Sequence, residues 1–360
     1  MIGDGESPHL LKWARALTAQ GEVELWVAST RGFVAAFDGV LPMERRLALD
    51  TRPRTGGGNA GVLLNLPRLA QWLREVDADW LHAHYLTSHG TLAWLAKRLY
   101  RLRAQIVGSA WGSDILVAPA TASLLRKLTA TVLRACALTT SDSLYMAARM
   151  RELGAREVMV FPFGLESLPP LTTSKQPWLF FSNRGLEPLY RPDLVLRVFS
   201  GIAAALPSAR LVVANDGSLA RALPSIATRL GLHVGRVDDG AQVEFVGRLT
   251  ATVQDRWYTR ASWFISLPAS DSVSVSVLEA MAHGCIPVLS DLPANAELVR
   301  NGVNGLLLRE QDIDPARLLE LASRAAEVAR GNHAWIASHA MFAPAVVRFV
   351  ERLRELGGAA

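Results

Sequence analysis

Two carboxylates eight residues apart, Asp271 and Glu279, are the clearest chemical feature of the sequence. Small and β-branched residues separate them, and Glu279 opens a helix-like segment that Gly284 ends before an apolar strand. The start of such a helix presents unpaired backbone N–H groups and the positive end of its dipole, which suits a phosphate. A carboxylate there can accept hydrogen bonds from paired sugar hydroxyls, so one element could hold a diphosphate and a ribose. The alternative interpretation is a buried helix that Glu279 only caps.

The elements that position these residues alternate between strands and helices along nearly the whole chain. Short apolar strands separated by amphipathic helices predict parallel sheets that are covered on both faces. The expected fold class is therefore α/β, with two doubly wound, Rossmann-like domains that face a cleft and bind ligands at the carboxyl ends of their strands. Strand-like runs lie at 23–28, 80–85, 106–111, 138–141, 158–162, 178–182, 211–214, 243–247, 263–267, 286–289 and 305–308.

A segment rich in Pro, Thr and Ser at 167–177 marks the predicted domain boundary. It gives an N-terminal domain of residues 1–168 and a C-terminal domain of residues 176–332. A last helix, at about 334–356 within residues 333–360, follows the second domain. The first strand of the N-terminal domain is predicted to be truncated, because only Met1 and Ile2 precede a glycine-rich turn.

Composition limits the class of protein. Half of the 360 residues are apolar and a fifth are charged, as in a globular protein of two or three domains. The chain has no apolar run long enough to span a membrane, its first residues do not show a charged-then-apolar signal pattern, and Cys136 and Cys285 lie in apolar segments. We therefore expect a cytoplasmic protein with reduced thiols. His82 and His84 share a strand face and could ligate zinc, but no third ligand has suitable spacing, so no metal is predicted.

The net charge of +5 is unevenly distributed. Residues 91–134 hold seven basic side chains and one acidic one, and apolar residues alternate with the basic ones over 92–102. Such a face suits an anionic membrane surface or an acceptor pyrophosphate, and equally an ordinary solvated helix face. Nucleic acid is not expected as a partner, since a sustained basic stripe with stacking aromatic residues is missing.

The stretch from Asp271 to Leu308 resembles the Glu-x7-Glu region of retaining GT-B glycosyltransferases, in particular those of family 4. The resemblance implies that Glu279 binds the ribose of a nucleotide sugar and that Asp271, in place of the first glutamate, contacts the transferred sugar. It also implies that backbone amides near Ser274 and Val275 face the donor phosphates.

Weaker matches extend this resemblance through the second domain. Arg184 matches an arginine that contacts the donor phosphates in the family. The lysine expected about five residues later is replaced by Leu189, and Arg191 is the nearest cation. The turn at Phe245-Val-Gly247-Arg248 matches a family turn near the nucleotide base, which implies a donor contact for Gly247.

In the first domain, the resemblance assigns an acceptor cleft to Gly3, Gly5, His82, His84, Trp111 and Asp114. Trp111 occupies the place where many relatives have a histidine that touches the donor sugar. An indole can stack on a sugar ring, but it has only one donor and no titratable nitrogen. The resemblance further implies that the last helix packs back towards the N-terminal domain.

These features together predict a retaining, metal-independent glycosyltransferase. It is expected to transfer a hexose or aminohexose from a nucleoside diphosphate sugar, with a UDP-sugar as first choice. The expected acceptor is lipid-linked, or is a cell-surface polysaccharide or lipopolysaccharide, and the enzyme is expected at the inner face of the membrane. Catalysis is assigned to Arg184, Asp271 and Glu279. A nucleoside diphosphate sugar epimerase of the same fold and a non-catalytic glycosyltransferase-like subunit remain alternatives.

Overall fold

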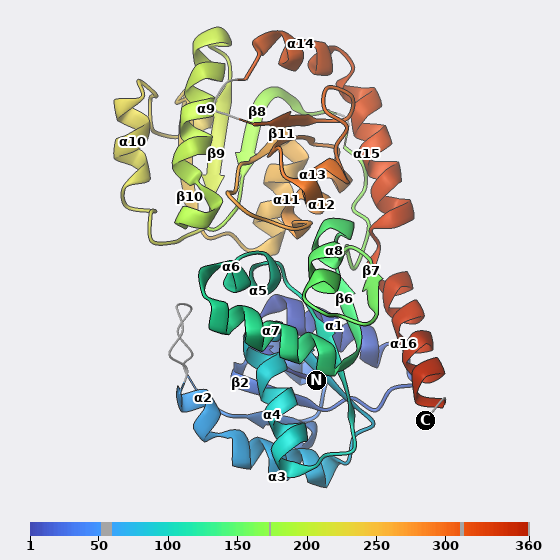
Figure 1. Ribbon diagram of the computed structural model, residues 1–360. Helices are drawn as coiled ribbons and strands as arrows, with labels where there is room; N and C mark the ends of the chain where they lie inside the picture. The colour runs from blue at the N-terminus through green and yellow to red at the C-terminus, as the bar shows by residue number, and fades with distance from the viewer. Residues whose placement is uncertain (52–59, 173, 310–312, 359–360) are drawn as a thin grey trace. The chain divides into compact units, whose positions relative to one another are not determined.

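The computed structural model describes residues 1–51, 60–172, 174–309 and 313–358 (Figure 1). The chain forms two compact units. Unit 1 comprises Met1–Pro162 and Phe342–Ala360, and unit 2 comprises Phe163–Met341. Each unit is built on one sheet, and every strand pair in the described residues is parallel. The α/β fold class with two parallel-sheet domains is thus confirmed.

Unit 1 holds a seven-stranded sheet in the order β3-β2-β1-β4-β5-β6-β7. Chain order reverses between β1 and β4, which makes their carboxyl ends the topological switch point where ligands bind in such sheets. The strands are β1 Ile2–Gly5, β2 Val27–Phe33, β3 Arg46–Ala48, β4 Trp80–His84, β5 Gln105–Ser109, β6 Cys136–Ser141 and β7 Val158–Val160.

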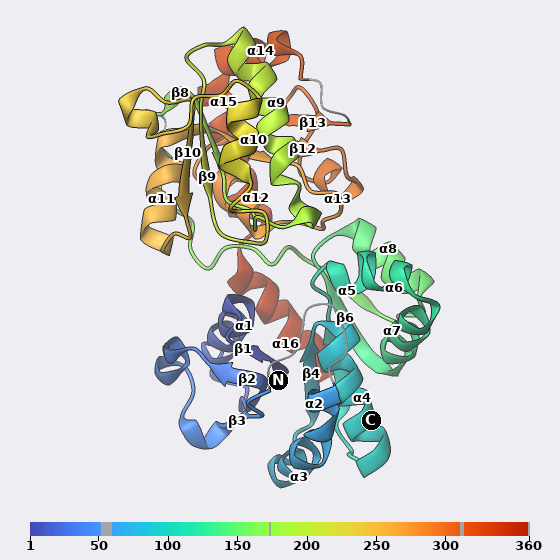
Figure 2. The same ribbon diagram turned by 90° about the vertical axis from the view of Figure 1, so that its left-hand side faces the viewer.

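Helices cover both faces of this sheet. On one face α1 and α16 lie together (Figure 2). Trp13 of α1 makes edge contacts with Phe342 and Phe349 of α16, with ring centroids 5.0 and 5.1 Å apart. Residues of α3, α4, α7 and α8 form the core on the other face. The helices are α1 Pro8–Thr18, α2 Ala60–Leu64, α3 Leu66–Val76, α4 Thr91–Tyr100, α5 Ser113–Leu116, α6 Ala118–Thr121, α7 Ser123–Ala135, α8 Leu144–Glu152 and α16 Phe342–Gly358, with short helical turns at Ala35–Gly39, Met43–Arg45 and Leu86–Gly90.

Unit 2 holds a six-stranded sheet in the order β10-β9-β8-β11-β12-β13, so its switch point lies between β8 and β11. Successive strand residues face opposite cores: Phe180 packs with α9, α10 and α14, and Phe181 packs with α11, α12 and α15. The strands are β8 Gln176–Ser182, β9 Arg210–Ala214, β10 Val243–Gly247, β11 Ala261–Ser266, β12 Ile286–Ser290 and β13 Leu306–Leu308. The helices are α9 Pro192–Ala205, α10 Leu223–Arg229, α11 Ala251–Arg260, α12 Val275–Ala282, α13 Pro293–Ala296, α14 Pro315–Ser323 and α15 Ala325–His339, with short turns at Pro188–Tyr190 and Val237–Asp239.

Three sequence predictions of elements are corrected. The first strand runs to Gly5 and is not limited to Met1 and Ile2, because β1 pairs with β2 along both glycines. The strand expected at 23–28 is β2 at Val27–Phe33, since its partner β1 begins opposite Ala28. The single helix expected over 334–356 is two helices, α15 and α16. They are interrupted where Met341 pairs with Leu165, whose N–H donates to the carbonyl oxygen of Ala340 at 2.7 Å.

Candidate functional site

Arg184 and Asp271 meet at the switch point of unit 2. Arg184 follows β8 and Asp271 follows β11, and Arg184 Nη2 lies 2.8 Å from Asp271 Oδ2. Arg184 Nη1 donates to the hydroxyl of Ser274. The side chains of Arg184 and Asp271 are 14 and 19% exposed, so the ion pair is largely shielded yet reachable. Burial raises the pKa of Asp271, an effect that the charge of Arg184 partly offsets.

The aromatic ring of Tyr190 fixes the orientation of Arg184. The guanidinium carbon lies 4.5 Å from the ring centroid, a cation–π contact that sequence reasoning did not identify. Arg184 is therefore held from three directions, by a carboxylate, a hydroxyl and a ring. Such preorganisation suits a cation that stabilises a negatively charged group without moving its own side chain.

Helix α12 begins at the same point. Ser274 is its N-cap in backbone conformation, but the Ser274 side chain makes no capping hydrogen bond, because its hydroxyl faces Arg184. The first-turn amides, which begin at Val275, therefore lie next to a cation and are not capped by Ser274. The positive end of the dipole and the cation together favour an anion.

Glu279 lies one turn further along α12. No acidic residue occupies the first turn of this helix, so the interpretation of Glu279 as a helix cap is not supported. Its Oε2 lies 3.1 Å from both Gln254 Nε2 and the Tyr258 hydroxyl of α11. The carboxylate is thus held by side chains, in an orientation that a loose surface glutamate would not keep.

Asn183 connects Glu279 with Arg184 and Gly247. Its side-chain Nδ2 donates to the Tyr258 hydroxyl at 2.8 Å, and its carbonyl oxygen accepts from Asn215 Nδ2 at 3.1 Å. The Asn215 N–H in turn donates to the carbonyl oxygen of Gly247 at 2.6 Å. Within the described residues, the buried Oδ1 of Asn183 has no hydrogen-bond partner. An oxygen of this kind is available for a donor group on a ligand.

Arg191 has a different environment from the one expected of a phosphate-binding cation. Its Nε and Nη2 donate to the carbonyl oxygens of Leu267 and Pro268 at 2.9 and 2.8 Å. Leu189, at the place of the family lysine, accepts through its carbonyl oxygen from Ala269 N–H at 2.8 Å. These contacts tie the loop after β8 to the loop after β11 and thereby set the spacing of Arg184 and Asp271. A donor contact for Arg191 stays a prediction.

His82 and His84 lie on β4, on the face covered by α1 and α16. His82 Nε2 lies 2.7 Å from the Ser109 hydroxyl, and its ring packs against Trp13 and Phe349. His84 is fully buried, and none of the described residues offers a partner to either of its ring nitrogens. Burial lowers the pKa of both side chains, which keeps them neutral at physiological pH. His82 is therefore a core residue, and only His84 lies near Trp111, with ring centroids 5.9 Å apart.

Asp114 organises the loops that follow β4 and β5. Its carboxylate accepts from the N–H of Leu86 at 2.7 Å and from the N–H of Trp111 at 2.9 Å. The side chain is fully buried, and burial raises its pKa to about 6. These contacts indicate a positioning role for Asp114. Trp111, whose ring centroid lies 5.1 Å from that of His9, is the residue that these contacts hold in place.

Gly3 and Gly5 lie in β1 and not in a turn. A Cβ atom at Gly5 would lie 2.5 Å from the carbonyl oxygen of Gly32 on β2. At Gly3 it would lie 2.7 Å from the side chain of Leu10. Both positions therefore require close approach of neighbouring elements, which is a structural role next to the switch point of unit 1.

Across the described ranges, no three His, Cys, Asp or Glu side chains lie together in a way that could hold a metal ion. Among the described residues, no helix has both the length and the apolar character needed to cross a bilayer.

Two protein-family models match the chain. One, described as glycosyl transferase 4-like, matches residues 1–146, and the other, described as glycosyl transferases group 1, matches residues 176–327. The first lies within unit 1 and the second within unit 2. Together they span most of the sequence.

Two curated proteins are similar to part of it. The D-inositol 3-phosphate glycosyltransferase of Rhodococcus erythropolis is 29% identical over 166 residues, which is 42% of this chain and 36% of that protein. The protein of the same name from a Nocardioides species is 30% identical over 144 residues, 37% of this chain and 31% of that protein. The chain thus spans about a third of the length of these relatives.

Solved structures match nearly the whole chain. Anabaena Alr3699/HepE in complex with UDP-glucose superposes with a TM-score of 0.77 at 16% identity, covering 98% of this chain and 99% of that one. The sucrose-phosphate synthase of Thermosynechococcus elongatus gives 0.78 at 13% identity, covering 99 and 96%. At these identities the likeness establishes the fold.

Proposed function

We propose a donor, an acceptor class and a stereochemical course for this chain, which belongs to the group 1 and family 4-like glycosyltransferases and has the GT-B fold. It is an enzyme that transfers a glycosyl group from a nucleotide sugar. The proposed donor is a UDP-hexose or UDP-aminohexose bound by unit 2. The UDP-glucose complex of the solved Anabaena relative supports this choice.

The proposal is carried by the position of Arg184, which donates to Asp271 and Ser274 at the start of α12. When the bond between the anomeric carbon and the β-phosphate oxygen breaks, its electron pair goes to that oxygen. A fixed cation and helix-start amides stabilise this developing charge, which is usually the largest catalytic effect. Glu279 is proposed to accept hydrogen bonds from the ribose and Asp271 to contact the transferred sugar. No metal is required in this scheme.

Retention of the anomeric configuration is proposed from the resemblance to family 4. The configuration of the product, read from its anomeric proton coupling by NMR, tests this point. An inverted product would contradict retention and would leave the donor assignment intact.

The donor is tested by a thermal-shift panel of UDP-, ADP-, GDP- and dTDP-sugars. A ligand at 100 times its dissociation constant stabilises the folded state by about 2.7 kcal/mol, so the correct base should give a clear rise in melting temperature. We expect the UDP series to stabilise the protein most, with release of UDP once an acceptor is added. No stabilisation by any nucleotide sugar would contradict the proposal.

The proposed acceptor is a lipid-linked or cell-surface saccharide, reached at an anionic membrane. Six basic residues of 91–134 are exposed, namely Arg98, Arg101, Arg103, Arg126, Lys127 and Arg134. Lys97 instead donates to the carbonyl oxygens of Arg103 and Ala104. Arg101 and Arg103 also line a hollow of about 150 Å³ together with Arg74.

Most of the apolar residues among these basic ones pack into unit 1. Leu92 is buried, Trp94, Leu95 and Leu102 pack against the core of unit 1, and Leu99 is 62% exposed. Insertion into a bilayer by a continuous apolar stripe is therefore not proposed; attraction is electrostatic.

Vesicle sedimentation tests the membrane proposal. We expect wild-type protein to sediment with phosphatidylglycerol vesicles at low salt and Arg98→Glu/Arg101→Glu/Arg103→Glu to remain in solution, because each cation near the surface contributes about 1 kcal/mol. Arg197→Glu on α9 of unit 2 is the control. Binding that persists at half-molar salt would contradict an electrostatic mechanism.

A further inference from the structure

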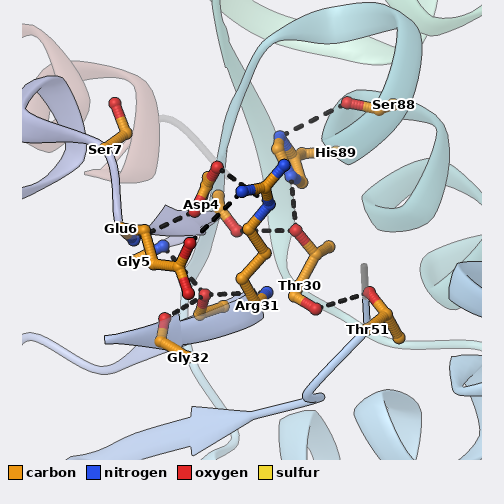
Figure 3. A network of polar contacts seen from close by, with 12 residues as sticks. Asp4, Gly5, Glu6, Ser7, Thr30, Arg31, Gly32, Thr51, Ser88 and His89 are labelled. Atoms are coloured by element: carbon orange, nitrogen blue, oxygen red, sulfur yellow. Dashed lines mark hydrogen bonds and ion pairs between the residues drawn. The ribbon is translucent and has the colours of Figure 1, made fainter. Parts of the chain in front are cut away.

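A bulge in β2 brings an arginine to the switch point of unit 1. Gly3 pairs with Ser29 and Gly5 with Phe33, so the three residues Thr30–Gly32 stand opposite Asp4 alone. Bulges of this kind redirect side chains and are common beside functional sites. Here the redirected side chain is Arg31, which turns towards the end of β1 (Figure 3).

A buried serine holds the bulge in shape. The hydroxyl of Ser29 accepts from the N–H of Gly5 at 2.8 Å and from the N–H of Arg31 at 3.1 Å, and it donates to the carbonyl oxygen of Gly32 at 2.8 Å. These three bonds use the whole capacity of a hydroxyl. Gly5 leaves no room for a Cβ against Gly32. The bulge is thus built into the strand and is not a loose loop.

A second set of contacts anchors the bulge to the loop after β4. His89 Nδ1 lies 2.5 Å from the carbonyl oxygen of His84, so this nitrogen carries the proton and donates. His89 Nε2 lies 3.1 Å from the Thr30 hydroxyl. The Thr51 hydroxyl donates to the carbonyl oxygen of Thr30 at 2.5 Å. The polar network therefore spans the ends of β1, β2 and β4 (Figure 3).

Arg31 lies against two carboxylates. Its Nη1 is 3.2 Å from Glu6 Oε2, and its Nε is 3.5 Å from Asp4 Oδ2. Asp4 Oδ1 accepts from the N–H of Glu6 at 2.9 Å, which orients both acids. The three side chains are 29 to 49% exposed, so a ligand can reach them. One positive and two negative groups give this cluster a net charge of −1.

The helix that follows β1 attracts an anion less than an uncapped helix start would. The hydroxyl of Ser7 caps α1 by accepting from the N–H of His9 at 3.3 Å. A capped helix start beside two carboxylates disfavours a phosphate, because one orphan donor is already satisfied and the local charge is negative. Carboxylates and a guanidinium are instead suited to sugar hydroxyls or an ammonium group.

We infer that the Asp4–Glu6–Arg31 cluster selects the acceptor: it binds an uncharged or amino-bearing saccharide through its hydroxyl or ammonium groups and rejects a phosphate ester at that point. The inference rests on the proposed glycosyl transfer and adds the chemical class of the group that unit 1 recognises. Sites that hydrogen-bond a substrate hydroxyl discriminate against an analogue that cannot pair with their polar groups.

Release of UDP from UDP-sugar tests this selection with matched acceptors: an octyl glucoside, glucosamine, and glucose 6-phosphate. The wild type should be stimulated by the first two and not by the phosphate ester. Asp4→Asn/Glu6→Gln, which keeps the shape and leaves Arg31 uncompensated, should raise the Michaelis constant for the neutral acceptors about tenfold and improve use of the phosphate ester. Glu24→Gln, which removes the similar Arg45–Glu24 pair (3.2 Å) elsewhere in unit 1, is the control.

Binding of UDP to the same variants distinguishes a failure of the acceptor inference from a failure of the proposed function. Unchanged UDP affinity with altered acceptor use supports the inference. Three results overturn it when UDP binding is intact. The phosphate ester stimulates as well as the neutral saccharides, the neutral saccharides do not stimulate, or the Michaelis constants of the double variant for the acceptors stay within twofold of the wild type. Failure of the wild type to bind any UDP-sugar would instead overturn the proposed function.

Discussion

The switch points of the two units share an arginine beside carboxylates and differ in the charge around it. In unit 2, Arg184 has one carboxylate partner, and Ser274 turns from the start of α12 to contact it. In unit 1, Arg31 has two carboxylate neighbours, and Ser7 stays on α1 as its cap. The same topology thus gives one place suited to an anion and one suited to neutral or cationic groups.

The difference shows that the class of ligand suited to the switch point of a doubly wound sheet depends on a few side chains close to it. A serine hydroxyl either caps its own helix or contacts a neighbouring cation, and this choice decides whether the first-turn amides remain available. One added carboxylate then takes the local charge from zero to −1. The sheet supplies the position, and a few side chains determine which ligand class fits.

Removal of the Arg184 side chain at the switch point of unit 2 should have the largest effect on activity. Because its charge is proposed to matter most as the diphosphate leaves, Arg184→Ala should lower kcat by about 10²- to 10³-fold, the range found when a group that stabilises developing charge is lost. Steady-state kinetics measure it, with Arg184→Lys to separate charge from the planar fork. A normal kcat with a raised Michaelis constant would mean that Arg184 binds ground and transition states equally.

Glu279 should give the next largest effect. If its carboxylate accepts ribose hydroxyls, Glu279→Ala should weaken UDP binding by about 10- to 100-fold, since a charged hydrogen bond contributes roughly 1.5–3 kcal/mol. Calorimetric titration with UDP measures the affinity, and Glu320→Ala on the surface of α14 is the control. A large fall in melting temperature with unchanged affinity would instead show that the contacts with Tyr258 and Gln254 are structural.

Gly5→Ala should have the smallest effect, and that effect should be confined to unit 1. A Cβ atom 2.5 Å from the Gly32 carbonyl oxygen must displace the bulge, so Gly5→Ala should cost about 1–3 kcal/mol of stability and lower acceptor use. UDP affinity should not change. Gly39→Ala, where the added Cβ meets nothing within 4 Å, is the matched control in chemical denaturation. Equal stability of the two variants would show that the bulge yields easily.

Much of this arrangement could be predicted from the sequence because it is local. Apolar runs between helical patterns mark the strands, and the spacing of Asp271 and Glu279 places both at the helix that follows β11. Arg184 comes directly after β8, so its place at the switch point follows from topology.

The remaining features depend on contacts between segments far apart in the chain. Glu279 is held by Tyr258 and Gln254, and Asn183 leaves a buried oxygen unpaired, but none of these residues has a spacing that signals the contact. Arg191 could equally have faced a ligand or, as found, two carbonyl oxygens. The Thr30–Gly32 bulge likewise cannot be recognised from the sequence of β2 alone, since only the register of β2 against β1 defines it.

Hydrogen–deuterium exchange of the whole chain with and without UDP tests the contrast between the two switch points most directly. The anion-suited arrangement in unit 2 predicts that UDP slows exchange in residues 183–191 and 271–282 and leaves residues 2–7 and 27–33 of unit 1 unchanged. Protection of the unit 1 segments with no protection at the start of α12 would contradict the assignment of the nucleotide to Arg184 and would reverse the roles of the two units.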